Sequence, residues 1–224
     1  MSYVIITGAS RGIGKALSYE YAKQGFDLIL TCEKNIKILI QNANDIKEKY
    51  NKKVYAIKGN INREYLNEIV NSKEDIYMLI NNASKANYNL LQDVTKDEYD
   101  DIINSNLTTV FENTKAVLPR LIHQKKGIIL NITSIWGLIG ASNEVIYSMT
   151  KGGVIAFTKA LSKEIFESNI ECFAIALGSV KTDMIKNYET KNTITIEEAA
   201  SFISHTTRNH NYKTGEIVEY KIEI

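Results

Sequence analysis

The sequence has little proline and little cysteine, and both shortages narrow the class of protein. Pro119 is the only proline in 224 residues, and we find no linker, repeat or low-complexity tract. The two cysteines, Cys32 and Cys172, lie inside apolar runs, so they are expected to be reduced core residues rather than a disulfide pair. The three histidines form no cluster with the spacing of metal ligands, so no metal is expected.

Long hydrophobic runs and an excess of one charge are also missing. No stretch approaches the roughly 20 apolar residues of a membrane span, so no membrane association is expected. The chain begins MSYVIITGAS, without the basic segment that opens a secretory signal. The net charge of +1 argues against nucleic acid as a partner. These absences favour a cytoplasmic protein.

The composition that remains is that of a globular α/β protein. Hydrophobic residues make up 44% of the chain, enough for a large core, and the length favours a single domain over residues 1–224. Short β-branched apolar runs alternate with amphipathic segments from end to end, which predicts a Rossmann-type, doubly wound parallel sheet with helices on both faces. About seven strands are expected, at 3–7, 26–31, 54–59, 76–81, 127–134, 170–177 and 216–222. Helices are expected at 12–24, 35–50, 96–124, 145–167 and from 196 onward.

Two local features qualify this pattern. Pro119 falls late in the helix expected at 96–124, where it is expected to cause a kink. The polar segment 183–195 is the best candidate for a mobile loop.

A glycine-rich turn follows the first expected strand. Gly8 permits a tight turn, Gly12 lets the backbone approach a pyrophosphate, and Gly14 lets the next helix pack closely on the strand. Free N–H groups at the start of that helix then face the anion. The spacing G-x-x-x-G-x-G differs from the common dinucleotide fingerprint, and a glycine-rich turn with no ligand is the alternative.

Tyr147, Lys151 and Ser134 form a candidate catalytic group. Tyr147 and Lys151 are four residues apart in an expected helix, so they share one face, and the ammonium is expected to lower the pKa of the phenol. Such a tyrosine can exchange a proton with a carbonyl or alcohol oxygen. Ser134 ends the fifth strand, at the edge where ligands bind in this architecture. Taken alone, the spacing of the tyrosine and lysine favours an ordinary pair on a helix surface.

Taken together, the motifs resemble those of the short-chain dehydrogenase/reductase family, and their order covers nearly the whole chain. They are T-G-x-x-x-G-I-G at 7–14, Asn-Asn-Ala at 81–83, Asn106 in SNLTTVF, Ser134 thirteen residues before Tyr147, Y-x-x-x-K at 147–151, and G-x-V-x-T at 178–182. Three positions depart from the family pattern: Ser84 replaces the glycine of N-N-A-G, Leu177 replaces the proline before Gly178, and Asn60 stands where an aspartate often meets the adenine.

The resemblance implies a role for each matching residue. Tyr147 would be the general acid/base, Lys151 would lower its pKa and hold the nicotinamide ribose, and Ser134 would orient the substrate carbonyl. Asn106 would support a water that relays protons from Lys151. Cofactor contacts are expected from Gly8, Ser10, Arg11, Gly12, Ile13, Gly14, Lys34, Asn60, Ile61, Asn82, Ala83, Tyr147, Lys151, Gly178, Val180 and Thr182.

The end of the second strand bears on the choice of cofactor. An acidic residue there binds the adenosine ribose and selects NAD, but Cys32 occupies the aligned position. Arg11 and Lys34 suit the 2′-phosphate of NADP, although they are equally ordinary surface charges. Glu33 favours NAD if the alignment shifts by one residue. NADP(H) is therefore favoured, with NAD(H) as the alternative.

Within the family, the sequence most resembles 3-oxoacyl-(acyl-carrier-protein) reductases. This implies an acyl-thioester substrate, with acyl carrier protein as a possible partner docking on Arg120, Lys125 and Lys126. A reductase of a sugar or other small carbonyl compound is one alternative, and an NADP-binding sensor or scaffold is another. The resemblance also implies a homodimer or homotetramer formed through the helices at 96–124 and 145–167.

Overall fold

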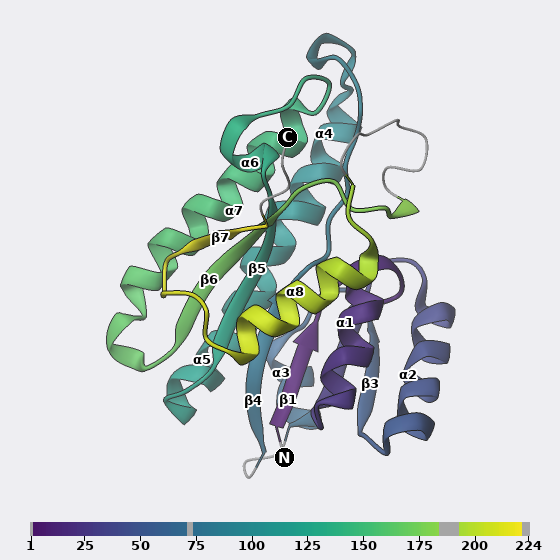
Figure 1. Cartoon of the computed structure of the whole chain (residues 1–224), viewed down its shortest axis with the longest axis vertical. Helices are drawn as coiled ribbons and strands as arrows, with labels where there is room; N and C mark the ends of the chain where they lie inside the picture. Colours follow the sequence, from purple (N-terminus) through teal and green to yellow (C-terminus); the bar gives the residue numbers. More distant parts are fainter. Residues whose placement is uncertain (1, 71–73, 184–192, 221–224) are drawn as a thin grey trace.

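A computed structural model of the chain describes residues 2–70, 74–183 and 193–220. These residues form a seven-stranded sheet in the order β3-β2-β1-β4-β5-β6-β7, with every neighbouring pair parallel. The predicted Rossmann-type α/β fold is therefore confirmed (Figure 1). The strands are β1 Ser2–Ile6, β2 Asp27–Cys32, β3 Val54–Lys58, β4 Asp75–Asn81, β5 Ile128–Ser134, β6 Glu171–Leu177 and β7 Ile217–Glu219.

Helices cover both faces of the sheet, which explains why the central strands are apolar on both sides. On one face α1, α2 and α8 pack against the strands through Leu17, Leu39 and Ile203. On the other face α3, α5 and α7 form a second core with side chains such as Val117 and Leu161. The helices are α1 Gly12–Lys23, α2 Ile36–Tyr50, α3 Arg63–Ile69, α4 Lys96–Ile103, α5 Thr109–Gln124, α6 Trp136–Ile139, α7 Val145–Glu164 and α8 Ile196–Arg208.

The helix predicted at 96–124 is not a uniform α-helix. The widened π-helical turn η2 at Asn104–Thr108 separates α4 from α5. Such a turn is often found where a helix carries functional side chains. α5 continues past Pro119 to Gln124. The short helices α3 and α6 lie in segments where no helix was predicted, because seven and four residues are too few to show a helical period.

The C-terminal region differs from its prediction in extent. β7 covers Ile217–Glu219, within the strand expected at 216–222, and residues 221–222 lie outside the described residues. Most of the loop expected at 183–195, namely 184–192, also lies outside them.

The topology fixes where a ligand can bind. The chain runs outward from β1 through β2 to β3, and then returns to β4 on the other side of β1. In an open parallel sheet, a crevice forms beyond the carboxyl ends of the strands at such a reversal. The turn after β1 and the loop after β4 therefore face each other across this crevice.

Candidate active site

A cavity of about 510 Å³ opens at the carboxyl edge of the sheet. Its walls come from the turn after β1, the ends of β2 and β5, the loops after β4 and β6, and the start of α7. Most of the residues that the sequence singled out lie together in its lining. They are Gly8, Ser10, Arg11, Gly12, Ile13, Lys34, Asn82, Ala83, Ser134, Tyr147, Lys151, Gly178, Val180 and Thr182.

The turn after β1 is closely packed and leaves backbone exposed to the cavity. A Cβ atom on Gly14 would lie 2.5 Å from the carbonyl oxygen of Gly8, so only glycine fits. Gly12 has a φ of +57° and lines the cavity without a side chain. Thr7 ties the turn to the loop after β4, because its Oγ1 accepts hydrogen bonds from the N–H groups of Asn82 and Ala83, both at 2.9 Å.

The start of α1 is suited to an anion. Arg11 is the N-cap residue, and its side chain makes no capping hydrogen bond. The first turn of α1 contains no acidic residue. The positive end of the helix dipole therefore faces the cavity without a protein carboxylate in that turn to neutralise it. Together with the exposed backbone at Gly12, this cradle fits the pyrophosphate of a dinucleotide.

Ser134, Tyr147 and Lys151 lie together at the inner end of the cavity. α7 presents Tyr147 and Lys151 on one face, with Lys151 Nζ 5.6 Å from the centre of the Tyr147 ring. Lys151 Nζ donates a hydrogen bond to the carbonyl oxygen of Ile132 at 3.0 Å. α6 packs closely against α7 at this point. Gly137 in α6 allows the close approach, because a Cβ atom there would lie 2.7 Å from the carbonyl carbon of Lys151.

The electrostatics of this group differ from the expectation that Lys151 lowers the pKa of Tyr147. Burial raises the pKa of Tyr147, and a hydrogen bond with Ser134 only partly offsets this effect. For Lys151 the same cause acts in the opposite direction: burial lowers the pKa of its ammonium to about 8. Lys151 is buried and Tyr147 is partly buried in the same cavity wall, and desolvation opposes the charged form of each. Tyr147 is therefore a neutral phenol, able to donate a proton.

Asn106 lies behind this group, in the widened turn η2. Its Nδ2 donates to Thr150 Oγ1 at 3.0 Å, and Thr150 immediately precedes Lys151 in α7. The same amide holds the backbone of Lys85, accepting from its N–H at 2.8 Å and donating to its carbonyl oxygen at 2.9 Å. Asn106 thus ties the loop after β4 to α7.

Three of the residues expected to contact the cofactor do not line the cavity: Gly14, which is packed against Gly8, and the neighbours Asn60 and Ile61. Asn60 donates a hydrogen bond from its side chain to Glu112 in α5. Ile61 is 4% exposed, and its N–H donates to Asn113 Oδ1 at 2.7 Å. Both residues are bound to α5 instead.

The end of β2 lies at another part of the cavity wall. Cys32 is the last residue of β2, and burial raises the pKa of its thiol. Glu33 lines the cavity and forms an ion pair with Lys85, with 2.9 Å between Oε2 and Nζ. Arg11 and Asp183 both line the cavity and form an ion pair with 3.6 Å between a guanidinium nitrogen and Oδ2, and both side chains are exposed. Glu33 is therefore the carboxylate that directly follows β2 in the cavity lining.

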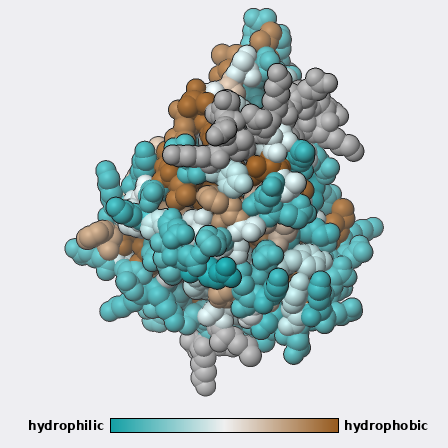
Figure 2. Space-filling view, in the orientation of Figure 1, coloured by the Kyte–Doolittle hydropathy of each residue, from teal (hydrophilic) through white to brown (hydrophobic). Residues whose placement is uncertain are grey.

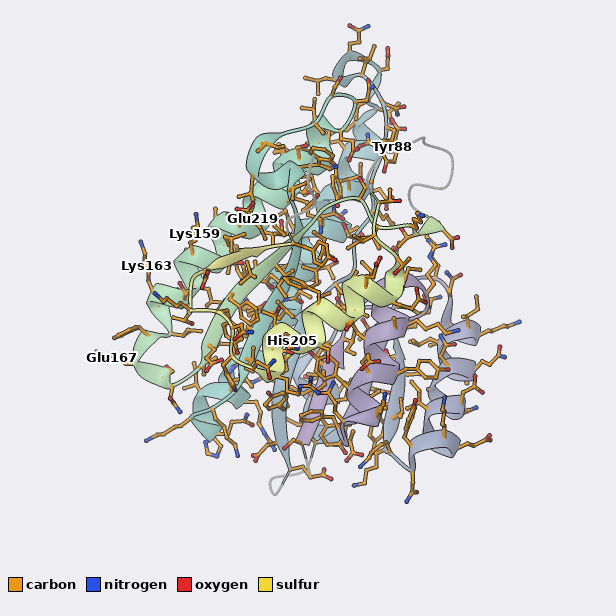
Figure 3. The ribbon with its side chains drawn as sticks, in the orientation of Figure 1. Tyr88, Lys159, Lys163, Glu167, His205 and Glu219 are labelled. Atoms are coloured by element: carbon orange, nitrogen blue, oxygen red, sulfur yellow. The ribbon has the colours of Figure 1, made fainter. Side chains whose placement is uncertain are left out.

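Several cavity residues were not predicted from the sequence. Ser84 lines the cavity with its hydroxyl buried beside Tyr147, whose pKa it lowers slightly by hydrogen bonding. Glu144 precedes α7 and lies one helical turn from Tyr147, a spacing that could have revealed it. Burial raises the pKa of the Glu144 carboxyl to about 7. Trp136 and Tyr88 complete this part of the wall. Figure 3 shows Tyr88 in the upper part of the molecule, whereas Lys159 and Lys163 project from the outer side of α7 and Glu167 lies just beyond the end of that helix.

Metal ligands and membrane spans were also sought in the part of the chain that the structure describes. There, no group of three or more His, Cys, Asp or Glu side chains is arranged to hold a metal ion. No described helix is both long and apolar enough to cross a membrane.

Comparison with known families and sequences gives a consistent result. The family model described as short chain dehydrogenase matches residues 2–193. The 3-oxoacyl-[acyl-carrier-protein] reductase FabG of Staphylococcus epidermidis is 32% identical over 185 residues, covering 80% of this chain and 75% of that protein. The corresponding FabG of Aquifex aeolicus is 34% identical, covering 80% and 74%. A Bacillus subtilis protein named uncharacterized oxidoreductase YmfI is 30% identical, covering 82% and 77%.

The fold also has a close match among solved structures. The crystal structure of acetoin dehydrogenase from Enterobacter cloacae superimposes with a TM-score of 0.84, covering 97% of this chain and 93% of that one. The sequence identity is 21%, so this likeness concerns the fold alone.

Proposed function

The chain belongs to the short chain dehydrogenase family, and we propose that it is an NADPH-dependent oxidoreductase that reduces the ketone of a 3-oxoacyl thioester to an alcohol. One observation carries this proposal. Ser134, Tyr147 and Lys151 share a single cavity with the glycine turn that fits a dinucleotide pyrophosphate. The named activity of the two FabG relatives supports the choice of substrate class.

Each residue of the group has a role in this reaction. The reduced nicotinamide supplies a hydride. Ser134 positions the substrate carbonyl by donating a hydrogen bond to its oxygen, and the neutral hydroxyl of Tyr147 donates a proton to that oxygen. Lys151 lies beside Tyr147 and holds the nicotinamide ribose through its ammonium. Asn106 binds the backbone of Lys85 and the side-chain hydroxyl of Thr150, and it is proposed to support the supply of protons to Lys151.

NADP(H) is proposed over NAD(H) because of the charges around the end of β2. Arg11 and Lys34 both line the cavity there, and a guanidinium suits a 2′-phosphate. Glu33 opposes this choice, although its carboxylate is paired with Lys85. Gly178, Val180 and Thr182 are proposed to contact the nicotinamide end, and Asn82 and Ala83 the neighbouring ribose.

A small polar carbonyl compound, such as a hydroxyketone or a sugar, is the second candidate substrate. Glu144 favours it, because a carboxylate beside Tyr147 can accept a hydrogen bond from a substrate hydroxyl. A sensor that binds NADP without turnover is the third reading, and the complete catalytic group argues against it.

Docking of acyl carrier protein on Arg120, Lys125 and Lys126 is not supported. α5 runs antiparallel to the strands, so these residues lie near the amino-terminal edge of the sheet, opposite the cavity. Lys126 pairs there with Asp75, the first residue of β4, at 2.6 Å. A carrier-bound substrate would need to approach the cavity from the opposite edge.

We also propose that residues 1–224 act as one NAD(P)-binding domain in a cytoplasmic homodimer or homotetramer. Exposed apolar side chains on the two helices expected to pair support self-association. They include Phe111 and Ile122 on α5, and Val145 and Met149 on α7. Figure 2 shows apolar side chains gathered over α6 and the start of α7. The two free, buried cysteines suit a reducing compartment. Light scattering at micromolar concentration tests the assembly, and a monomer would contradict it.

The deciding experiment follows oxidation of NADPH and NADH with acetoacetyl-CoA, acetoacetyl carrier protein and a small hydroxyketone. Rapid NADPH oxidation with a thioester supports the proposal, and a preference for the carrier-bound form identifies the partner. Turnover of the hydroxyketone alone favours the second candidate. NADPH binding without turnover of any carbonyl favours the sensor.

A further inference from the structure

Lys85 joins two carboxylates across the cavity wall, and the proposed reaction gives this contact no role. Its Nζ donates to Glu33 Oε1 at 3.0 Å and to Asp101 Oδ1 at 2.6 Å. Glu33 follows β2, Asp101 lies in α4, and Lys85 stands in the loop after β4. All three residues line the cavity. The ammonium therefore stands next to the acidic group that a dinucleotide-binding fold places at the adenosine ribose.

The structure holds Lys85 firmly in this position. Both backbone polar groups of Lys85 are bonded to the side-chain amide of Asn106. Its side chain is 25% exposed and that of Glu33 is 56% exposed, so water reaches the pair mainly from the side of Glu33. Partial burial lowers the pKa of Lys85, but the hydrogen bonds to Asp101 and Glu33 outweigh it and raise the pKa above its ordinary value. Lys85 therefore remains charged at neutral pH.

We propose that Lys85 is a specificity-determining residue that allows NADPH to bind by neutralising Glu33. A free carboxylate at this position accepts hydrogen bonds from the ribose hydroxyls and repels a 2′-phosphate. When the ammonium engages both oxygens of Glu33, its acceptor atoms are occupied and its negative potential falls. Arg11 and Lys34 can then bind the 2′-phosphate without repulsion from the carboxylate of Glu33. This inference rests on the proposed NADPH-dependent function.

The alternative is that the contact is an ordinary salt bridge with a small effect on stability. Dissociation constants for the two cofactors separate these readings, because a merely structural role would change both by the same factor. Trp136 provides the signal, since it is the only tryptophan and lines the cavity. Its fluorescence reports binding of NADPH or NADH without any turnover.

The test compares the wild type with Lys85→Met and Lys96→Met. Lys96 forms an ion pair with Asp100 on α4, but it lies outside the cavity lining and is therefore a matched control. We expect Lys85→Met to lower the ratio Kd(NADH)/Kd(NADPH) about tenfold, the effect of one nearby charge at an intermediate dielectric. Lys96→Met should leave the ratio unchanged. A Lys85→Met protein that melts like the wild type with an unchanged ratio would overturn the proposal.

A second pair of variants tests the mechanism. The Glu33→Gln substitution removes the carboxylate that follows β2 and leaves Lys85 paired with Asp101 alone, so Lys85→Met in this background should change the ratio by less than about threefold. A full tenfold change there would overturn neutralisation, because Lys85 would then act on the phosphate directly. The wild-type ratio tests the cofactor proposal separately. A wild type that prefers NADH removes the NADPH assignment, while the shift caused by Lys85→Met still decides the role of Lys85.

Discussion

The ammonium of Lys151 and the carbonyl oxygen of Ile132 form a hydrogen bond of 3.0 Å in the interior of the protein. Lys151 is 3% exposed, and no ion pair to its ammonium is found among the described residues. Burial alone lowers its pKa to about 8 from an ordinary value of 10.5. The charged ammonium of Lys151 therefore opposes folding at neutral pH, because burial removes it from water without a counter-charge in the part of the chain that the structure describes.

We predict that Lys151→Met stabilises the protein while abolishing turnover. Below pH 8 the lysine is charged in both states, so the folded state carries the whole desolvation penalty. As the pH rises from 8 to 10.5, the unfolded state binds more protons, and the penalty disappears. Urea unfolding at pH 7 should show a gain of about 1–3 kcal/mol, reduced by the unpaired carbonyl of Ile132.

The pH dependence of this gain in stability shows whether desolvation of Lys151 is its cause. The advantage of Lys151→Met should shrink between pH 8 and pH 10. Lys159→Met, at an exposed position of the same helix, should change stability by less than about 0.5 kcal/mol at either pH. A Lys151→Met protein less stable than the wild type at pH 7 would show that packing and the hydrogen bond to Ile132 outweigh desolvation.

Tyr147→Phe should remove turnover and keep cofactor binding. The phenol is the proposed proton donor, and loss of general acid catalysis typically lowers kcat by about 10²–10⁴-fold. The ring and its packing remain, so Kd for NADPH from Trp136 fluorescence should change by less than about threefold. Tyr65→Phe, on the exposed side of α3, serves as the control. Equal turnover in Tyr147→Phe and wild type would exclude Tyr147 as the acid.

Glu144→Gln should become increasingly stabilising as the pH rises. Burial raises the pKa of Glu144 from 4.5 to about 7. The contribution of this carboxyl to stability is therefore fully present below pH 4.5 and is lost as the pH rises through 7. Because the side chain is half-exposed, we expect the variant to gain only about 1 kcal/mol at pH 8 and nothing at pH 4.5.

Thermal melting at pH 5 and pH 8 measures this difference. Glu167→Gln removes an exposed carboxylate near the far end of α7 and should show no such trend. If both variants followed the same pH dependence, the effect would come from net charge rather than from burial of Glu144.

Much of the fold could be predicted because the signals were local. Strands such as Asp27–Cys32 and Glu171–Leu177 are buried on both sides, so their apolar runs stand out from the helices between them. The π turn at Asn104–Thr108 could not be predicted in this way. It changes the register of one helical turn without changing composition, and its cause lies in contacts such as that between Asn106 and Thr150.

In the candidate site, too, the residues with local signals were predicted and those joined by long-range contacts were not. Motif spacing predicted the group around Tyr147, because these residues lie on one helix and one strand end. The pair of Glu33 and Lys85 joins residues 52 positions apart, so no local pattern contains it. The raised pKa of Tyr147 could not be predicted from the sequence either, since its burial depends on cavity walls contributed by several distant segments.

Gly14→Ala tests whether the turn after β1 is a closely fitted cradle. Inside a helix, replacing glycine by alanine normally stabilises a protein by about 1 kcal/mol. Here the new Cβ would lie 2.5 Å from the carbonyl oxygen of Gly8 and 2.7 Å from Nδ2 of Asn82. The first of these is backbone that cannot move without opening the turn. We therefore expect a loss of about 1–3 kcal/mol in urea unfolding, the typical effect of overpacking.

The same substitution should weaken NADPH binding, because α1 must shift away from the position at which its first N–H groups face the pyrophosphate. Kd should rise more than about tenfold, the consequence of losing about 1.4 kcal/mol of anion contacts. Lys15→Ala, at the exposed neighbouring position, should change neither quantity. A Gly14→Ala protein that is more stable than the wild type and binds NADPH as tightly would show that the turn can yield. The close approach of Gly14 to Gly8 would then not be required for cofactor binding.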